Sequence, residues 1–154
     1  MLIGVISDTH GLLRPELLPA LSRVDHILHA GDIGDPDILT RLATIAPVTA
    51  IRGNIDTHGP NSLLPATEAI ELAGSLLYLL HSRSDLDLKP EAASIAAVIY
   101  GHSHKPSIEH HNGVLYLNPG SCGPRRFNLP ITYALLHIAE GIAQAEILPL
   151  LPNG

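Results

Sequence analysis

The feature that most constrains this chain is a series of short apolar runs, each of which stops at a glycine-containing polar segment carrying Asp, Asn or His. Leu2–Ser7 ends in DTHG, His26–Ala30 in GDIGD, and Val48–Arg52 in GNID. Continuous apolar runs of this length are typical of strands buried on both faces, especially where helix-like segments separate them. The pattern predicts an α/β fold with a largely parallel sheet.

Two helices are expected between these strands. Arg14–Val24 has apolar residues at helical spacing behind Pro15, which is a favourable residue for the first turn of a helix. Pro36–Ala46 has the same character. The pattern therefore predicts one helix after each of the first two strands.

The second half of the chain is richer in strand signals. Glu68–Ala73 and Ser75–Leu80 flank Gly74 as the two arms of a hairpin would. Further strands are expected at Ile95–Tyr100, across the turn signal NG in SIEHHNGVLYLN, and at Thr132–Ile138 with Ala143–Leu148. We expect a single domain over residues 1–154, with two sheets packed together and helices outside.

Composition disfavours several function classes. Of the 154 residues 45% are hydrophobic and 16% charged, which suits a globular chain with a buried core. The net charge is −6 and Lys and Arg do not cluster, which disfavours long nucleic acids and anionic membranes as partners. The low charged fraction leaves apolar surface to cover and suggests a homo-oligomer.

The same sequence carries signals about the compartment. Its apolar runs are far shorter than the about 20 residues that cross a bilayer, and no basic segment with a cleavage site follows Met1. The single Cys122 cannot form an intrachain disulfide, which suits a reducing compartment. We expect a soluble cytoplasmic protein without a membrane partner.

Polar side chains gather immediately after the apolar runs. In open α/β sheets, ligands bind outside the carboxyl ends of the strands, so side chains that follow several strands converge there. Residues two apart in an extended segment also point to the same side. The side chains expected to meet are those of Asp8, His10, Asp32, Asn54, His81, His102 and His104.

These residue types indicate a metal site. Carboxylates mixed with imidazoles suit Mn²⁺, Fe or Zn²⁺ better than Ca²⁺, and Asn54 can add a neutral carbonyl oxygen. Seven candidate ligands are too many for one transition ion but fit two ions that share a carboxylate. Two-metal sites of this kind serve phosphoester hydrolysis, because the ions stabilise both the attacking and the leaving oxygen.

The ordered motifs SDTHG, HAGDIGD, RGNID, LLHS and YGHSHKP resemble those of the calcineurin-like metallophosphoesterases, in their small YfcE-type phosphodiesterase branch. The resemblance runs from Leu2 to about Leu136, because YLNPGSCGPRRFNLP is similar to the closing segment of the family. It implies two mixed β-sheets packed as a sandwich with flanking helices. It also implies a phosphodiesterase in which a hydroxide that bridges two metals attacks phosphorus.

The resemblance assigns the ligands residue by residue. Mn²⁺ is the favoured ion, with Fe, Zn²⁺ and Ni²⁺ as alternatives. One metal would be held by Asp8, His10 and His104, the second by Asn54, His81 and His102, and Asp32 would bridge the two. His29, which precedes AGD, is expected to order the loop of Asp32 from behind and not to bind metal.

One departure from the family pattern concerns proton donation. Many members carry His directly after the Asn, where it is thought to protonate the leaving oxygen, but this chain has Ile55. We hypothesise that protonation passes to Asp56, to a metal-bound water or, more weakly, to His58. Anchoring the loop of Asn54 is an equally good role for Asp56. Ser82 and Arg83 follow His81 where Gly is frequent, which leaves open any contact of Arg83 with phosphate.

Two functions from different classes follow. The first is a divalent-metal-dependent phosphodiesterase that acts on a small phosphoester substrate, since basic residues that would hold long nucleic acids are lacking. The alternative is a metal-binding protein-interaction module on the same fold, with weak or no catalysis, because one fold hosts several functions. Ile55 and the low surface charge favour the alternative, whereas the complete ligand set favours the enzyme.

Overall fold

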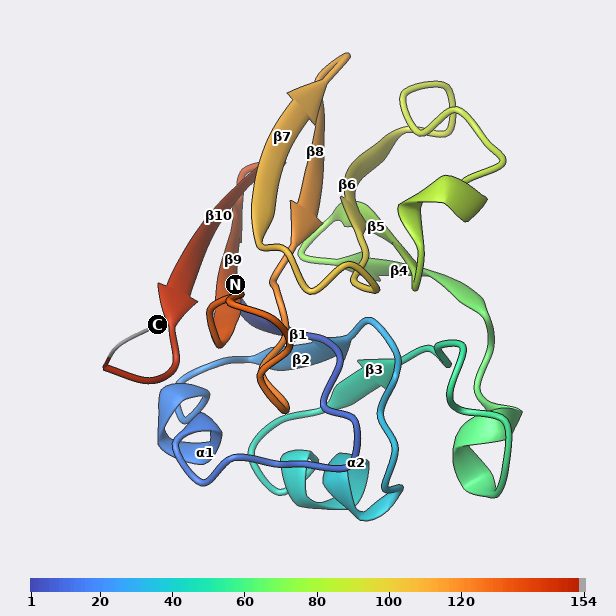
Figure 1. Ribbon diagram of the computed structural model, residues 1–154. Coiled ribbons are helices and arrows are strands. Elements are labelled where there is room, and N and C mark those ends of the chain that lie inside the picture. The colour runs from blue at the N-terminus through green and yellow to red at the C-terminus, as the bar shows by residue number, and fades with distance from the viewer. Residues whose placement is uncertain (153–154) are drawn as a thin grey trace.

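The computed structural model describes residues 1–152, and within them two five-stranded sheets dominate (Figure 1). The strands are β1 (Leu2–Ile6), β2 (His26–His29), β3 (Val48–Ala50), β4 (Thr67–Leu72), β5 (Ser75–Leu80), β6 (Ile95–Ile99), β7 (Ser107–His111), β8 (Val114–Asn118), β9 (Thr132–Ala139) and β10 (Ile142–Pro149). The helices are α1 (Leu17–Ala20), α2 (Asp37–Leu42) and the 3₁₀ segments η1 (Pro60–Leu63) and η2 (Arg83–Asp85).

Both sheets mix parallel and antiparallel strands, as the resemblance implied. The first has the order β10-β9-β1-β2-β3, with β1, β2 and β3 parallel and β9 and β10 antiparallel to their neighbours. The second has the order β4-β5-β6-β8-β7, with β5, β6 and β8 parallel between two antiparallel edge strands. The three expected hairpins are therefore confirmed.

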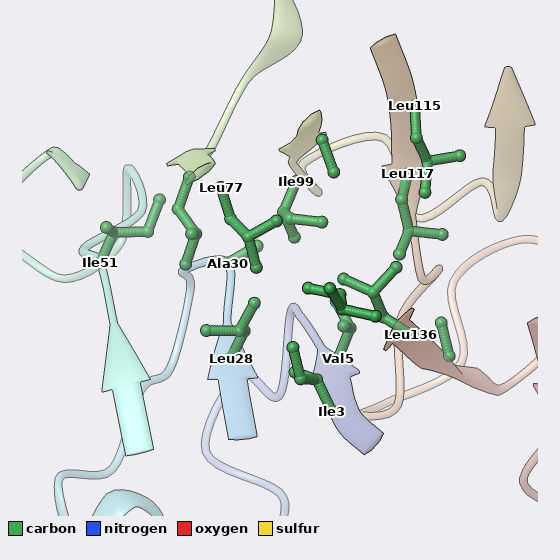
Figure 2. Close-up of a cluster of buried hydrophobic side chains, with 14 residues drawn as sticks. Ile3, Val5, Leu28, Ala30, Ile51, Leu77, Ile99, Leu115, Leu117 and Leu136 are labelled. Carbon is green, nitrogen blue, oxygen red and sulfur yellow. The ribbon is translucent and has the colours of Figure 1, made fainter. Parts of the chain in front are cut away.

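The core lies between the two sheets and is purely aliphatic at its centre (Figure 2). Ile3, Val5 and Leu28 of the first sheet face Leu77 and Ile99 of the second, and all five side chains are fully buried. Burial of such side chains contributes about 1.5–3 kcal/mol each, which is why the predicted apolar runs become central strands. This packing fixes the two sheets relative to each other.

The helices are shorter than the 14–24 and 36–46 spans that helical spacing predicted. Pro19 lies inside the first segment and has no N–H to offer, so the segment continues as three-residue turns on both sides of α1. Pro47 stops the second segment, whose last turn also tightens after Leu42. The apolar positions were identified correctly, since Leu17, Leu21, Ile38 and Leu42 pack on the first sheet.

The second sheet has a different cover from the one expected. Its outer face carries Tyr100 and Tyr116 at its buried centre, and Leu86 and Leu88 from the 81–94 connection pack against it. In the described part of the chain, α1 and α2 flank the first sheet alone (Figure 1). None of the helices in residues 1–152 is long and apolar enough to span a membrane.

The aliphatic layer between the sheets can be tested with a matched pair of leucines. Leu79 is fully buried between the sheets, whereas Leu63 is 87% exposed. Leu79→Ala should lower the free energy of unfolding by about 2–5 kcal/mol, because it leaves a cavity, and Leu63→Ala by less than about 0.5 kcal/mol. Urea denaturation followed by circular dichroism measures both. Equal losses would contradict this packing.

Candidate metal centre

Five strands end at the edge where the two sheets meet, and the polar segments that follow them form one cluster (Figure 1). The segments after β1, β2 and β3 come from the first sheet, and those after β5 and β6 from the second. The structure brings five of the predicted strand-end side chains together in two overlapping groups of potential ligands: Asp8, His10 and His104, and Asp8, Asp32 and His81.

Asp8 lies at the centre of the first group. Its Oδ1 is 3.4 Å from Nε2 of His104 and 3.7 Å from Nε2 of His10. The carboxylate of Asp32 lies between the two groups, because its Oδ2 is 3.3 Å from Nε2 of His10 and 3.2 Å from Nε2 of His81. A carboxylate in this place could contact a cation on either side.

Asn54 and His102 join the cluster from the second side. One terminal atom of the Asn54 amide lies 3.1 Å from Nε2 of His81 and 3.2 and 3.3 Å from the two oxygens of Asp32. With the NH₂ group there, the amide donates to both oxygens of Asp32 and to Nε2 of His81, whereas an oxygen there would face acceptors only. The His102 ring lies edge-on to that of His81, with 5.2 Å between centroids, and its backbone N–H donates to Oδ2 of Asp8. His102 stands outside the two ligand groups and is exposed.

Several buried polar atoms of the cluster have no hydrogen-bond partner in the described residues. Nδ1 of His81 lies 2.8 Å from the carbonyl of Ala30 and donates to it, so Nε2 of the neutral ring presents a lone pair to the carboxylates. Asp8 Oδ1, His10 Nε2 and both ring nitrogens of His104 are buried and have no hydrogen-bond partner in the described residues. Buried polar atoms are rarely left unpaired. Metal cations would satisfy them, and the donor set suits transition ions.

Both carboxylates are held in their charged form. Burial opposes ionisation of Asp8, but the imidazoles of His10, His104 and His81 outweigh it and hold the pKa of this carboxyl well below its usual range. Burial also opposes ionisation of Asp32, yet the contact with His81 lowers its pKa. Burial disfavours the charged imidazole of His81, and its contacts with Asp32 and Ala30 nevertheless raise its pKa. Asp8 and Asp32 therefore both carry a negative charge at neutral pH.

The ligand side chains converge by a different backbone geometry from the predicted one. Five candidate ligands have a positive φ: 59° at Asp8, 45° at His10, 58° at Asp32, 71° at His102 and 62° at His104. The pairs at spacing two are thus aimed by left-handed turns and not by the alternation of an extended strand. Each such residue costs about 1 kcal/mol or more, and strain of this kind gathers at functional sites.

Two glycines let the backbone approach the carboxylates closely. A Cβ at Gly53 would lie 2.1 Å from Oδ1 of Asp32. A Cβ at Gly101 would lie 2.0 Å from Oγ of Ser7 and 2.7 Å from Oδ2 of Asp8. Any side chain at either position would push a carboxylate out of place. These two glycines of the RGN and YGH motifs therefore set the positions of Asp32 and Asp8.

Sequence reasoning missed the residues that orient the ligands. The buried hydroxyl of Ser7 donates to Oδ2 of Asp8 at 2.7 Å. The amide of Asn118 donates to the carbonyl of Gly101 and to Oγ of Ser103, which fixes the turn that carries His102 and His104. Neither residue carries a pattern of its own. The only signal in the sequence was the position of each inside a quoted stretch, Ser7 in SDTHG and Asn118 in YLNPGSCGPRRFNLP.

His29 supports the cluster from below. Its ring is fully buried, accepts the N–H of Gly31 at Nδ1 and lies 3.0 Å from Oγ1 of Thr9 at Nε2. Because Nδ1 is an acceptor, the proton sits on Nε2 and points to Thr9, whose hydroxyl donates to the carbonyl of Ile33. These contacts join the segment after β1 to the segment that carries Asp32.

Asp56 is buried beneath the loop of Asn54. Its carboxylate accepts backbone N–H groups from Ile33, Gly34 and Gly53 at 2.8–3.1 Å. Of the two roles that the sequence left open, these contacts favour the anchor. Arg83 points elsewhere, because its guanidinium pairs with Glu109 and stacks on the ring of Tyr116 at 4.5 Å.

The buried state of His29 predicts a pH effect on stability. Desolvation lowers the pKa of His29 from 6.5 to about 4. In the unfolded chain His29 therefore binds a proton below about pH 6.5, whereas in the folded chain it binds one only below about pH 4. Between these two pH values protonation favours the unfolded state, so His29 lowers the free energy of unfolding as the pH falls. With chelator present throughout, wild type should lose about 2 kcal/mol more than His29→Gln between pH 7 and pH 5. Parallel urea titrations at both pH values measure this, and identical pH profiles would contradict it.

Two kinds of comparison bear on this geometry. The calcineurin-like phosphoesterase superfamily domain matches residues 1–141. A protein of Methanothermobacter thermautotrophicus named "Probable metallophosphoesterase" is 40% identical over 160 residues, covering 96% of this chain and 92% of the relative. "Phosphodiesterase MJ0936" of Methanocaldococcus jannaschii is 26% identical over 141 residues, covering 79% of this chain and 84% of the relative.

Solved structures share the fold. An archaeal phosphodiesterase superposes with a TM-score of 0.78 at 24% identity, covering 96% of this chain and all (100%) of the other. Vps29 of Entamoeba histolytica, solved in complex with Zn²⁺, superposes with a TM-score of 0.73 at 24% identity, covering 98% and 100%. The motifs, the two mixed sheets and the domain match agree, and the chain belongs to the calcineurin-like phosphoesterase superfamily.

Proposed function

We propose that this protein is a divalent-metal-dependent phosphoesterase that hydrolyses small phosphodiesters at a dinuclear centre. The observation that carries the proposal is the set of buried polar atoms of Asp8, His10 and His104 that have no hydrogen-bond partner within residues 1–152. The family domain and the relative named as a phosphodiesterase support the same chemistry. When bound, the ions would supply Lewis-acid activation of water and charge for the phosphate oxygens.

The proposed ligands follow the two sides of the cluster, and Asp32 is shared. Its Oδ2 lies between His10 on one side and His81 on the other, which supports a bridging role. The remaining assignments are Asp8, His10 and His104 for one ion, and Asn54, His81 and His102 for the other. Two divalent ions would exceed the charge of the two carboxylates by two, so the site would attract a phosphate anion to an acidic chain.

The ions themselves are proposed from ligand chemistry. Four imidazoles and two carboxylates with one amide oxygen suit Mn²⁺, with Fe, Zn²⁺ and Ni²⁺ as alternatives. A closed structural zinc site would use four tetrahedral ligands, which this larger and oxygen-rich set does not resemble.

We further propose that no side chain protonates the leaving group. Ile55, which follows Asn54, is 42% exposed and cannot donate a proton, although its backbone N–H binds Oδ1 of Asp32. Asp56 accepts backbone N–H bonds through both oxygens and acts as a positioning residue for the loop of Asn54. Proton delivery is then left to water, which favours leaving groups that need little protonation.

A metal-binding interaction module is the second candidate function. Ile55 at the position of the expected proton donor favours it. Leu12, two residues after His10, Leu63 at the end of η1, and Phe127 are also exposed apolar side chains, which a protein partner could cover. Turnover of a diester decides between the two candidates.

The proposed enzyme predicts metal-dependent turnover. Chelator-stripped protein should not hydrolyse bis(p-nitrophenyl) phosphate, and Mn²⁺ should restore turnover. Asp32→Asn and His102→Ala should each lower kcat/KM at least about 100-fold, because each removes a ligand or its charge. His110→Ala is the matched control, since this exposed histidine lies on β7, outside both ligand groups.

Calorimetric titration of stripped protein with Mn²⁺ provides a second readout. Two bound ions in wild type, and weaker binding in both ligand variants, are expected. Metal binding without turnover of this easy aryl diester would reject the enzyme and favour the interaction module.

The absence of a side-chain proton donor predicts a dependence on the leaving group. Activity of wild type should fall steeply as the leaving-group pKa rises across a series of aryl and alkyl phosphodiesters. Ile55→His should raise kcat at least about tenfold on alkyl esters while changing aryl esters little, because a general acid matters most for a basic leaving oxygen. Ile55→Gln controls for the polar substitution. A flat dependence in wild type would contradict the absence of a general acid.

A further inference from the structure

A surface cavity of about 460 Å³ opens beside the second half of the metal centre. Asn54, His81 and His102 form one wall. The rest of the lining comes from the segment after β3, the start of β4 and the segment after β5, and includes Arg52, Thr67, Ser82, Ser84 and Asp85. A phosphate held at the centre would therefore have part of one ester arm in this cavity.

Arg52 gives the cavity a cation with unused donors. Its Nη1 donates to the carbonyl of Leu64 at 2.6 Å, and its backbone N–H donates to the carbonyl of Pro65. In residues 1–152 no carboxylate lies within 4.0 Å of its guanidinium. A guanidinium has five N–H donors. The bond to Leu64 anchors the group at the edge of the cavity and leaves further N–H donors that can bind an anion.

The neighbouring arginine cannot take this role. Arg83 pairs with Glu109, donates to the hydroxyl of Tyr100 and lies over the ring of Tyr116. These contacts hold its charge on the outer face of the second sheet. Arg52 is the cation among the residues that line the cavity.

We propose that the cavity is a subsite for the retained ester arm of the substrate, and that Arg52 selects arms carrying a second anionic group, such as a phosphate. This inference rests on the proposed phosphoesterase function and names its substrate class. The hydroxyls of Thr67 and Ser82 line the same cavity and can donate to anion oxygens, whereas the carboxylate of Asp85 in the same lining repels additional negative charge. Because the chain carries a net charge of −6, a cation at this position distinguishes the cavity from the rest of the surface as a place where an anion can bind.

The test compares two aryl diesters with the same leaving group. One is the p-nitrophenyl ester of thymidine 5′-phosphate, and the other carries an additional 3′-phosphate on the retained thymidine. Bis(p-nitrophenyl) phosphate, whose arms are uncharged, reports basal activity. The measurement is kcat and KM for the three esters with Mn²⁺-loaded wild type, Arg52→Gln and, as a matched control, Arg23→Gln, an exposed arginine after α1 that does not line the cavity.

The expected result is a preference of about tenfold or more in kcat/KM for the 3′-phosphorylated ester, expressed through KM, in wild type and Arg23→Gln. Arg52→Gln should lose this preference while it keeps its kcat on bis(p-nitrophenyl) phosphate. An equal preference in Arg52→Gln, or none in wild type, would overturn the proposal.

Failure of the proposed function would look different. If wild type with bound Mn²⁺ turns over none of the three esters, the Kd values of the two thymidine esters still test the subsite. Tighter binding of the 3′-phosphorylated ester that depends on Arg52 would support it. Equal Kd values would overturn it.

Discussion

The structure depends on one local conflict, which is that carboxylate oxygens and imidazole nitrogens are buried together and several of them have no hydrogen-bond partner in residues 1–152. Oxygens of Asp8 and Asp32 face ring nitrogens of His10, His81 and His104 at 3.2–3.8 Å. Such a cluster opposes folding of the metal-free chain, and left-handed backbone at five candidate ligands adds to the cost. The aliphatic layer between the sheets has to offset both, which explains why so small a protein devotes its core to branched aliphatic side chains.

Supporting contacts reduce that conflict without removing it. Ser7 fixes one oxygen of Asp8, and backbone N–H groups fix Asp56 beneath the loop of Asn54. His29 stays neutral and aims its proton at Thr9, away from the carboxylates. Each contact restricts the orientations that a ligand side chain or its loop can adopt. The lone pairs that remain point inward, so the cluster is prepared for cations before any arrives.

Sequence reasoning was strongest where a physical pattern repeats. Apolar runs such as Ile95–Tyr100 predicted the central strands, and the position of His81 at the end of one placed it in the cluster. Helix lengths failed, because Pro19 inside an apolar repeat changes the turn without changing the spacing of buried residues. The spacing of His102 and His104 predicted correctly that both lie at the cluster, but it predicted the wrong backbone geometry. A positive φ at a histidine cannot be recognised from the amino-acid sequence. The roles of Ser7 and Asn118 and the unused donors of Arg52 needed the three-dimensional structure, because a single polar side chain forms no repeating pattern.

The origin of the ligands in both sheets has a consequence for how the chain folds. Asp8 and His104 are separated by more than half of the 154-residue chain, and their side chains meet only after β1 and β6 have docked through the aliphatic layer. An ion held between them would act as a cross-link that closes a very long loop, and long loops gain most from closure. Local segments synthesised early cannot assemble such a site by themselves. Capture of the metal would therefore be a late event that reports completion of folding and slows the reverse reaction.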